Sequence, residues 1–159
     1  MNALIVDGYN AIYKITELQT LLDKSLLEAR REVTRLAKDY QRKTGGIAEV
    51  YVVFDGKDDY RGSPHPPLAN QIFSKTGEGD EAIIKTVEKL SGRYHCIVAS
   101  DDNFVRNNAR AYRATVISIA EFSAGAKKKK TAKRSDASDE KRIDPKSARE
   151  ITDYFKRHL

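Results

Sequence analysis

The sequence predicts an α/β fold with a mainly parallel central sheet flanked by helices. Short apolar runs alternate along the chain with longer stretches in which apolar residues recur every three or four positions. The runs are typical of buried parallel strands, and the longer stretches are typical of amphipathic helices. Their alternation favours right-handed strand–helix–strand crossovers, and 159 residues suffice for one hydrophobic core.

The elements are expected in the following order. The predicted strands are 3–7, 49–56, 71–74, 94–100 and 114–119, of which 71–74 is the weakest. The predicted helices are a brief one after Gly8, a long one at 21–43, one within 76–92, one at 103–113 and a single turn after 119. The glycines at 45 and 46 end the long helix. Residues 1–124 are therefore expected to form the folded domain.

The net charge of +6 lies entirely in the C-terminal part of the chain. Residues 1–124 contain 17 basic and 17 acidic residues, whereas residues 125–159 contain 12 basic and 6 acidic ones. We expect a flexible basic linker at 125–145 and a C-terminal helix at 146–159. Lysine-rich segments bind polyanions by counterion release, which favours a nucleic acid or ribonucleoprotein partner over a merely solvated linker or a membrane surface.

Composition also indicates the cellular compartment. The single cysteine, Cys96, lies in an apolar run and can form no intrachain disulfide, which fits a reducing cytoplasm. No apolar run approaches the roughly 18 residues of a membrane span. The chain reaches Asp7 after only four apolar residues and lacks a basic start, so a signal peptide is not expected.

Acidic residues follow three of the predicted strands. Asp7, Asp55 and Asp101 each stand at a strand end, and Asp80 stands at the start of a helix, followed by Glu81. Because parallel strands end at one edge of the sheet, where helix N-termini also open, these carboxylates are expected to converge. Magnesium prefers oxygen ligands and needs only one or two carboxylates. The set therefore predicts a divalent metal site suited to phosphodiester hydrolysis, with Asn10 within reach.

Each acid also has a structural explanation. Asp101 or the adjacent Asp102 could cap the helix that follows, Asp80 could cap its own helix, and Asp55 could serve an Asp-Gly turn. Asp7 is the hardest to explain in this way, since it ends a buried strand. No P-loop or GxGxxG motif is present, and the three histidines show no metal-ligand spacing.

The stretch "LIVDGYN" resembles the opening motif of the YacP-like branch of the NYN domains, which belong to the PIN-like nucleases. "YVVFDG", "GDEAI" and "VASDD" resemble the second strand, the acidic helix start and the late Ser-Asp motif of that family. The resemblance covers about residues 1–124. It implies a Rossmann-like PIN fold and an Mg²⁺- or Mn²⁺-dependent endoribonuclease, associated with RNA and with the ribosome.

The resemblance also assigns roles to residues of this chain. Asp7, Asp80 and Asp101 would be the catalytic metal ligands. The supporting residues would be Asn10, Asp55 and Ser100, to which we add Glu81 and Asp102, the acidic neighbours of Asp80 and Asp101. Glu78-Gly79 replaces the Thr-Ala that the family often has before the helix-start Asp, so either Asp80 or Glu81 could be the ligand.

Contacts with single-stranded RNA are predicted from aromatic and basic residues. Tyr9 and Tyr13 are candidates for base stacking, although each could instead pack in the protein. The basic candidates are Arg106, Arg110, Arg113, Lys127, Lys128, Lys129, Lys130, Lys133 and Arg134. The alternative functions are a non-catalytic RNA- or ribosome-binding module with a vestigial acidic pocket, and a phosphatase acting on small esters.

Overall fold

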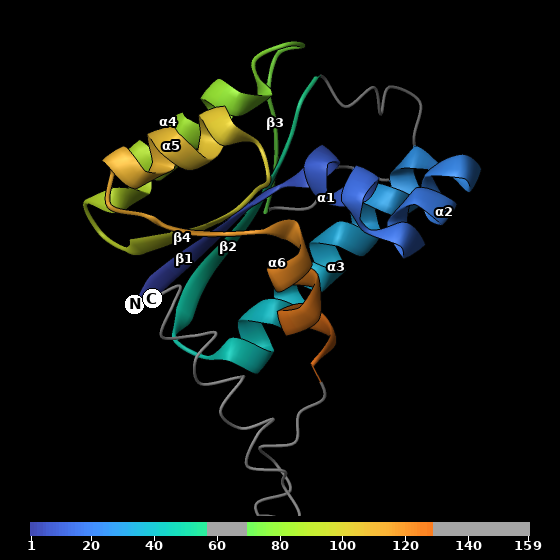
Figure 1. Ribbon diagram of the computed structural model, residues 1–159, viewed down its shortest axis with the longest axis horizontal. Helices are drawn as coiled ribbons and strands as arrows, with labels where there is room; N and C mark the ends of the chain where they lie inside the picture. The colour runs from blue at the N-terminus through green and yellow to red at the C-terminus, as the bar shows by residue number, and fades with distance from the viewer. Residues whose placement is uncertain (57–69, 129–159) are drawn as a thin grey trace, which may run out of the picture. The chain divides into compact units, whose positions relative to one another are not determined.

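The computed structural model describes residues 1–56 and 70–128, which contain a five-stranded, wholly parallel sheet in the order β3-β2-β1-β4-β5 (Figure 1). The strands are β1 (Asn2–Asp7), β2 (Ile47–Phe54), β3 (Gln71–Phe73), β4 (His95–Ala99) and β5 (Thr115–Ile117). β1 is central, and its four interior residues are buried because helices cover both sides of the sheet. The predicted α/β fold with a parallel sheet is confirmed.

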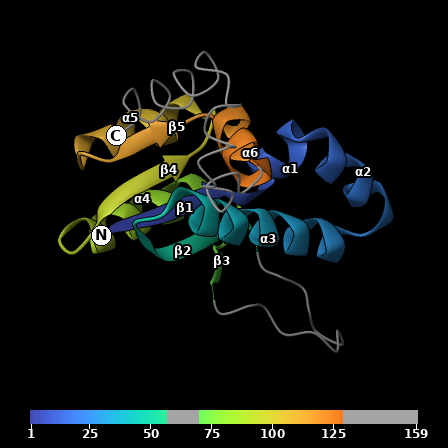
Figure 2. The same ribbon diagram turned by 90° about the horizontal axis from the view of Figure 1, so that it is seen from below.

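The described residues form six helices, of which five cover the two faces of this sheet. The six are α1 (Gly8–Lys14), α2 (Thr16–Lys24), α3 (Leu26–Thr44), α4 (Gly79–Ser91), α5 (Asn103–Ala111) and α6 (Ile119–Lys127). Helices α4 and α5 lie on one face, and α1, α3 and α6 lie on the other (Figures 1 and 2). Helix α2 packs against α1 and α3. The side chains of β1 alternate between the two cores, with Leu4 and Val6 in the larger one and Ile5 in the smaller.

The long helix predicted at 21–43 is wrong as a single element, because the chain breaks at Ser25. Ser25 adopts an extended backbone (φ −163°, ψ 123°), and its Oγ accepts a hydrogen bond of 3.2 Å from the amide of Glu28. Ser25 and Glu28 have the spacing of a capping box, which begins α3 and separates it from α2. The preceding residues, predicted only as a turn and a brief helix, form α1 and α2 instead.

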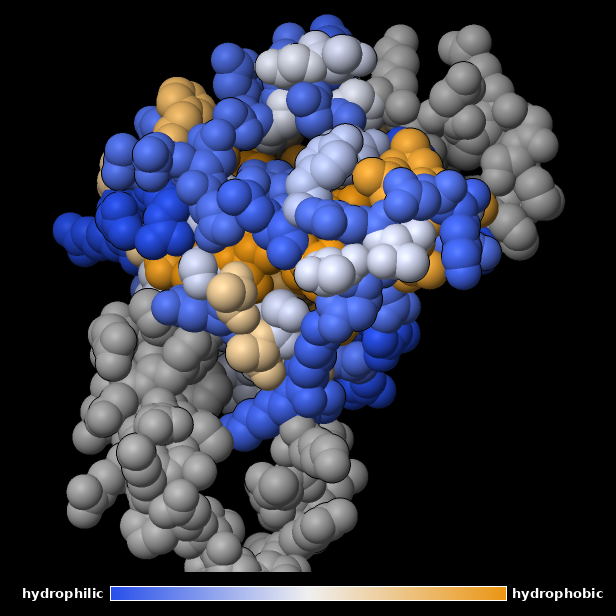
Figure 3. Space-filling view, turned by 45° about the vertical axis from the view of Figure 1, so that its right-hand side comes forward, coloured by the Kyte–Doolittle hydropathy of each residue, from blue (hydrophilic) through white to orange (hydrophobic). Residues whose placement is uncertain are grey.

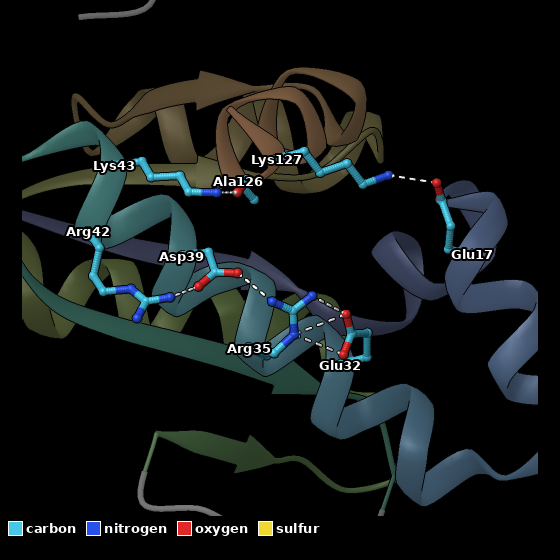
Figure 4. A network of polar contacts seen from close by, with 8 residues as sticks. All are labelled: Glu17, Glu32, Arg35, Asp39, Arg42, Lys43, Ala126 and Lys127. Atoms are coloured by element: carbon cyan, nitrogen blue, oxygen red, sulfur yellow. Dashed lines mark hydrogen bonds and ion pairs between the residues drawn. The ribbon is translucent and has the colours of Figure 1, made fainter. Parts of the chain in front are cut away.

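Helix α6 is longer than the single turn predicted after 119, and it packs against α3. Gly125 lies so close to Tyr40 that an added Cβ would stand 2.5 Å from a ring carbon. Phe122 packs on the same ring, and the Lys43 ammonium donates to the carbonyl of Ala126 at 2.6 Å (Figure 4). These contacts hold 125–127, predicted as the start of the linker, in the folded part.

The face of the protein shown in Figure 3 is mostly hydrophilic, with apolar residues visible in a band between the polar ones. Within the residues described, no helix combines the length and apolarity that crossing a membrane requires. The remainder of the predicted basic linker and the predicted helix at 146–159 lie outside the described residues.

Candidate active site

A pocket of about 380 Å³ lies at the carboxyl edge of the sheet, where the sequence predicted converging acids. The ends of β1 and β2 supply Asp7 and Asp55, the segment after β4 supplies Asp102, and the first turn of α4 supplies Asp80. The other polar side chains that line it are those of Tyr9, Asn10 and Tyr13. Among the described residues, four carboxylates and no basic side chain line this acidic pocket, so it is built to attract a cation.

Asp7 is the most perturbed of these acids. The pKa of Asp7 is raised to about 6, chiefly by burial and to a smaller extent by the nearby carboxylates of Asp80 and Asp102. The Ser100 hydroxyl donates to Asp7 Oδ2 at 2.9 Å, which fixes the carboxylate and partly opposes the rise. A carboxylate held in this environment is stabilised in its charged form by a bound cation.

Asp80 faces Asp7 from α4. Its pKa is raised by burial first, and then by the charges of Asp102 and Asp55. The close approach of α4 to β2 depends on Gly79, where an added Cβ would stand 2.7 Å from the Cβ of Asp55. Asp80 lines the acidic pocket, whereas the Glu81 side chain is exposed on α4 and is not among the lining residues.

The adjacent residues Asp101 and Asp102 have different surroundings. Asp102 lines the acidic pocket, and its Oδ1 also caps α5 by accepting the amide of Val105 at 3.1 Å. Asp101 Oδ1 accepts the amide of Ile119 at 3.0 Å, at the start of α6, and Asp101 lines a different pocket. The structure thus places Asp102, rather than Asp101, with Asp7 and Asp80.

Two of the predicted supporting residues hold this segment in place. The Ser100 Oγ is fully buried and accepts the amide of Asp102 at 3.1 Å, while Asn10 Oδ1 accepts the amide of Asp101 at 2.9 Å. Asp55, a third, accepts the amide of Gly77 at 2.8 Å and so also shapes the loop before α4. These side chains order the backbone around the pocket as well as lining it.

Arg30 is a contributor that the sequence analysis missed. It is 8% exposed on α3, and its Nη2 donates to the hydroxyl of Tyr9 at 2.6 Å. Its guanidinium also lies over the rings of Phe54 and Phe73, 5.9 Å and 5.2 Å from their centroids. The signal was present, because Arg30 precedes Val33 and Ala37 at helical spacing on the apolar face of α3.

The predicted RNA-contacting residues are widely distributed. Tyr13 is 59% exposed at the acidic pocket, and Arg110 is exposed on α5. Arg106 donates to the carbonyl of Ser100 at 3.0 Å. Arg113 lies beyond the end of α5 with φ 63°, so it does not continue the helical face shared by Arg106 and Arg110. Lys127 and Lys128 are the last two described residues, while Lys129, Lys130, Lys133 and Arg134 lie outside the described residues.

The carboxylate oxygens of the acidic pocket fit a hydrated divalent cation. In residues 1–56 and 70–128, no group of three His, Cys, Asp or Glu side chains is arranged to hold a metal ion directly. Mg²⁺ keeps several waters and binds through one or two carboxylates, so a ready-made cage of three protein ligands is not required. Such an ion would offset the repulsion that helps to raise the pKa of Asp7, and it would find carboxylate oxygens in the lining as ligands.

A parallel α/β sheet with carboxylates gathered at its carboxyl edge is consistent with the PIN-like nucleases. The chain belongs to one family among them, because residues 4–159 match the YacP-like NYN domain. It is similar to the crystal structure of Rae1 (YacP) from Bacillus subtilis in its W164L mutant form. That match has 30% identity and a TM-score of 0.63, and it covers 79% of this chain and 75% of the other.

A second crystal structure of Rae1 (YacP) from Bacillus subtilis matches with 22% identity and a TM-score of 0.55. It covers 98% of this chain and 93% of the other, and at this identity it supports the fold alone. The comparison with curated proteins found no match. The predicted membership of the YacP-like NYN family is therefore confirmed by the family match and the more similar structure.

The different positions of Asp101 and Asp102 predict unequal effects of the same substitution. For the metal-dependent RNA cleavage proposed below, Asp102→Asn should lower the rate about 10–100-fold, since the pocket loses a charge while asparagine remains a good helix cap. Asp101→Asn should keep the hydrogen bond to Ile119 and leave cleavage within about threefold of the wild-type rate. Initial rates at equal protein concentrations give the comparison. A larger loss in Asp101→Asn would reverse these assignments.

Proposed function

We propose that this protein is a metal-dependent endoribonuclease that cleaves single-stranded RNA by attack of water on a phosphodiester. The observation that carries the proposal is the convergence of Asp7, Asp80 and Asp102 on one pocket, where burial and mutual repulsion raise the pKa values of the first two. Such a cluster is costly without a cation. The chain belongs to a family of PIN-like nucleases, in which such a cation would serve phosphodiester hydrolysis.

Within this proposal, Asp7, Asp80 and Asp102 hold Mg²⁺ or Mn²⁺, with Asp55 beside them. When bound, the metal supplies a water of lowered pKa and a positive charge near the phosphate. The Ser100 hydroxyl keeps the Asp7 carboxylate oriented, and Asn10 fixes the backbone that leads to Asp102. Asp101 acts as the cap of α6 rather than as a direct ligand.

RNA binding is assigned to side chains around the acidic pocket. Tyr13 lines it and offers an exposed aromatic face to bases, whereas the Tyr9 ring packs against Phe54 and its hydroxyl is held by Arg30. Arg110 and the lysine-rich segment add sequence-independent attraction for phosphates. This arrangement suits an extended RNA strand, including messenger RNA associated with the ribosome.

The proposal is tested by incubating the full chain with end-labelled single-stranded RNA and Mn²⁺, with and without EDTA. We expect internal cuts with Mn²⁺ and at least about a hundredfold fewer with the chelator, since metal-ion catalysis is worth several kcal/mol. RNA binding without cuts would favour the non-catalytic RNA- or ribosome-binding module. Turnover of a generic phosphate ester with intact RNA would favour a phosphatase. Either of those results would contradict the endoribonuclease.

A further inference from the structure

A second pocket adjoins the acidic one and has no part in the proposed reaction. Its volume is about 480 Å³, and its lining comes from the end of α1, the start of α2, α6 and Asp101. Consecutive residues are divided between the two pockets, because Asp102 lines the acidic pocket and Asp101 lines the second. Tyr13 and Lys14 are divided in the same way. The two pockets therefore lie on either side of the same two short segments, 13–14 and 101–102.

The second pocket has an apolar floor. Ile15 and Ile119 lie almost fully buried beneath it, and the exposed methyl groups of Ala120 and Ala124 supply accessible apolar surface on its α6 side. Pockets that bind small planar groups combine such apolar surface with a few polar groups at the edge. The floor therefore suits the face of a nucleobase.

Unlike the acidic pocket, this pocket is lined by basic as well as acidic side chains, with Glu17 and Asp101 beside two lysines. Lys14 and Lys127 stand here, and the Lys127 ammonium pairs with Glu17 at 2.9 Å (Figure 4). Both partners are largely exposed, so the pair contributes little and a phosphate can displace Glu17. Lys127 is also the first of the four consecutive lysines at 127–130. Positive charge is thus available beside the acidic pocket.

We propose that this second pocket, called here the flanking pocket, binds the base of the nucleotide next to the one held at the acidic pocket. Lys14 and Lys127 contact the phosphate of that nucleotide. RNA is the occupant because the flanking pocket joins an apolar floor to phosphate-binding charge and adjoins the proposed cleavage site. The inference rests on the proposed function for its substrate class, and its test measures binding so that the two can fail separately.

The test compares two labelled oligomers of equal length, a single-stranded RNA and the same sugar–phosphate chain without bases. Fluorescence anisotropy in Ca²⁺ gives the affinities, with intact RNA verified on a gel. The wild-type protein should bind the RNA about tenfold more tightly than the abasic chain, which is the effect expected for one or two base contacts. Ala124→Leu and Ala120→Leu place bulk in the flanking pocket from exposed positions of a helix. Each should reduce that preference at least about threefold and leave binding of the abasic chain unchanged.

Two control variants separate the parts of the inference. Ala111→Leu makes the same change at an exposed position of α5 and should alter neither affinity. Lys14→Gln should weaken both oligomers alike and reduce the slope of log K against log salt by about one. An unchanged preference in both α6 variants, or equal losses for the two oligomers, would overturn the flanking pocket. Wild-type protein that shows the expected preference but makes no cuts in Mn²⁺ would overturn the proposed function and leave the pocket standing.

Discussion

Replacing Asp7 by asparagine is expected to lower the rate of metal-dependent RNA cleavage by about 10³-fold, because several kcal/mol of metal-ion catalysis depend on its charge. The side-chain shape is retained, and the asparagine oxygen still accepts a hydrogen bond from Ser100. The affinity for RNA should therefore stay within about threefold, since base and phosphate contacts are made by other residues. Single-turnover cleavage and anisotropy with the same labelled RNA measure the two quantities.

The matched control for this experiment is Asp23→Asn. Asp23 is an exposed acid of α2 outside the acidic pocket, so the same loss of charge should leave cleavage unchanged. Cleavage by Asp7→Asn at a rate comparable with the wild type would remove Asp7 from the mechanism. A parallel loss of RNA binding would instead indicate a structural role for this carboxylate.

The same substitution is expected to stabilise the protein at neutral pH when no metal is bound. The pKa of Asp7 is raised from 3.8 to about 6, so the folded protein keeps this proton over a range in which the unfolded chain releases it. Stability therefore falls as pH rises from about 4 to above 6, by up to about 3 kcal/mol for this group. Asparagine has no proton to lose and avoids that penalty.

Urea unfolding with EDTA at several pH values measures this effect. Asp7→Asn should match the wild type below pH 4 and exceed its free energy of unfolding by up to about 3 kcal/mol at pH 7.5. Added Mg²⁺ should recover stability in the wild-type protein and have little effect on the variant. An advantage that stays constant with pH, or a variant that is less stable at pH 7.5, would contradict the burial of an ionised Asp7. Loss of activity together with a gain in stability is typical of a strained functional group.

The sheet and the convergence of acids could be predicted from sequence because both follow from a simple periodic pattern. Apolar runs that end in Asp7 and Asp55 place their carboxylates at one edge of any parallel sheet. The break at Ser25 was also readable, since Ser25 and Glu28 have the spacing of a capping box. The apolar positions of α2 and α3 follow one another without a gap, and this continuous pattern led to the prediction of a single helix.

The assignment of Asp101 and Asp102 could not be made in the same way. Successive residues of an extended segment point to opposite sides, so one of the two had to leave the acidic pocket. Which one leaves depends on the amide of Ile119, which begins a helix after the next strand. The role of Arg30 likewise depends on the rings of Phe54 and Phe73, which are far from it in sequence. Helical spacing places Arg30 on the apolar face of α3, but it does not show which distant side chains Arg30 meets there.

The most direct test of the account is the position of Mn²⁺ in crystals of the full chain soaked with that ion. An anomalous difference map should show a peak in the acidic pocket, bound directly or through water by Asp7, Asp80 and Asp102. Crystals of Asp7→Asn treated in parallel should lose that peak or show it greatly weakened. No peak in the wild-type pocket, or a peak on Asp101 instead, would contradict the claim that these three carboxylates share a cation.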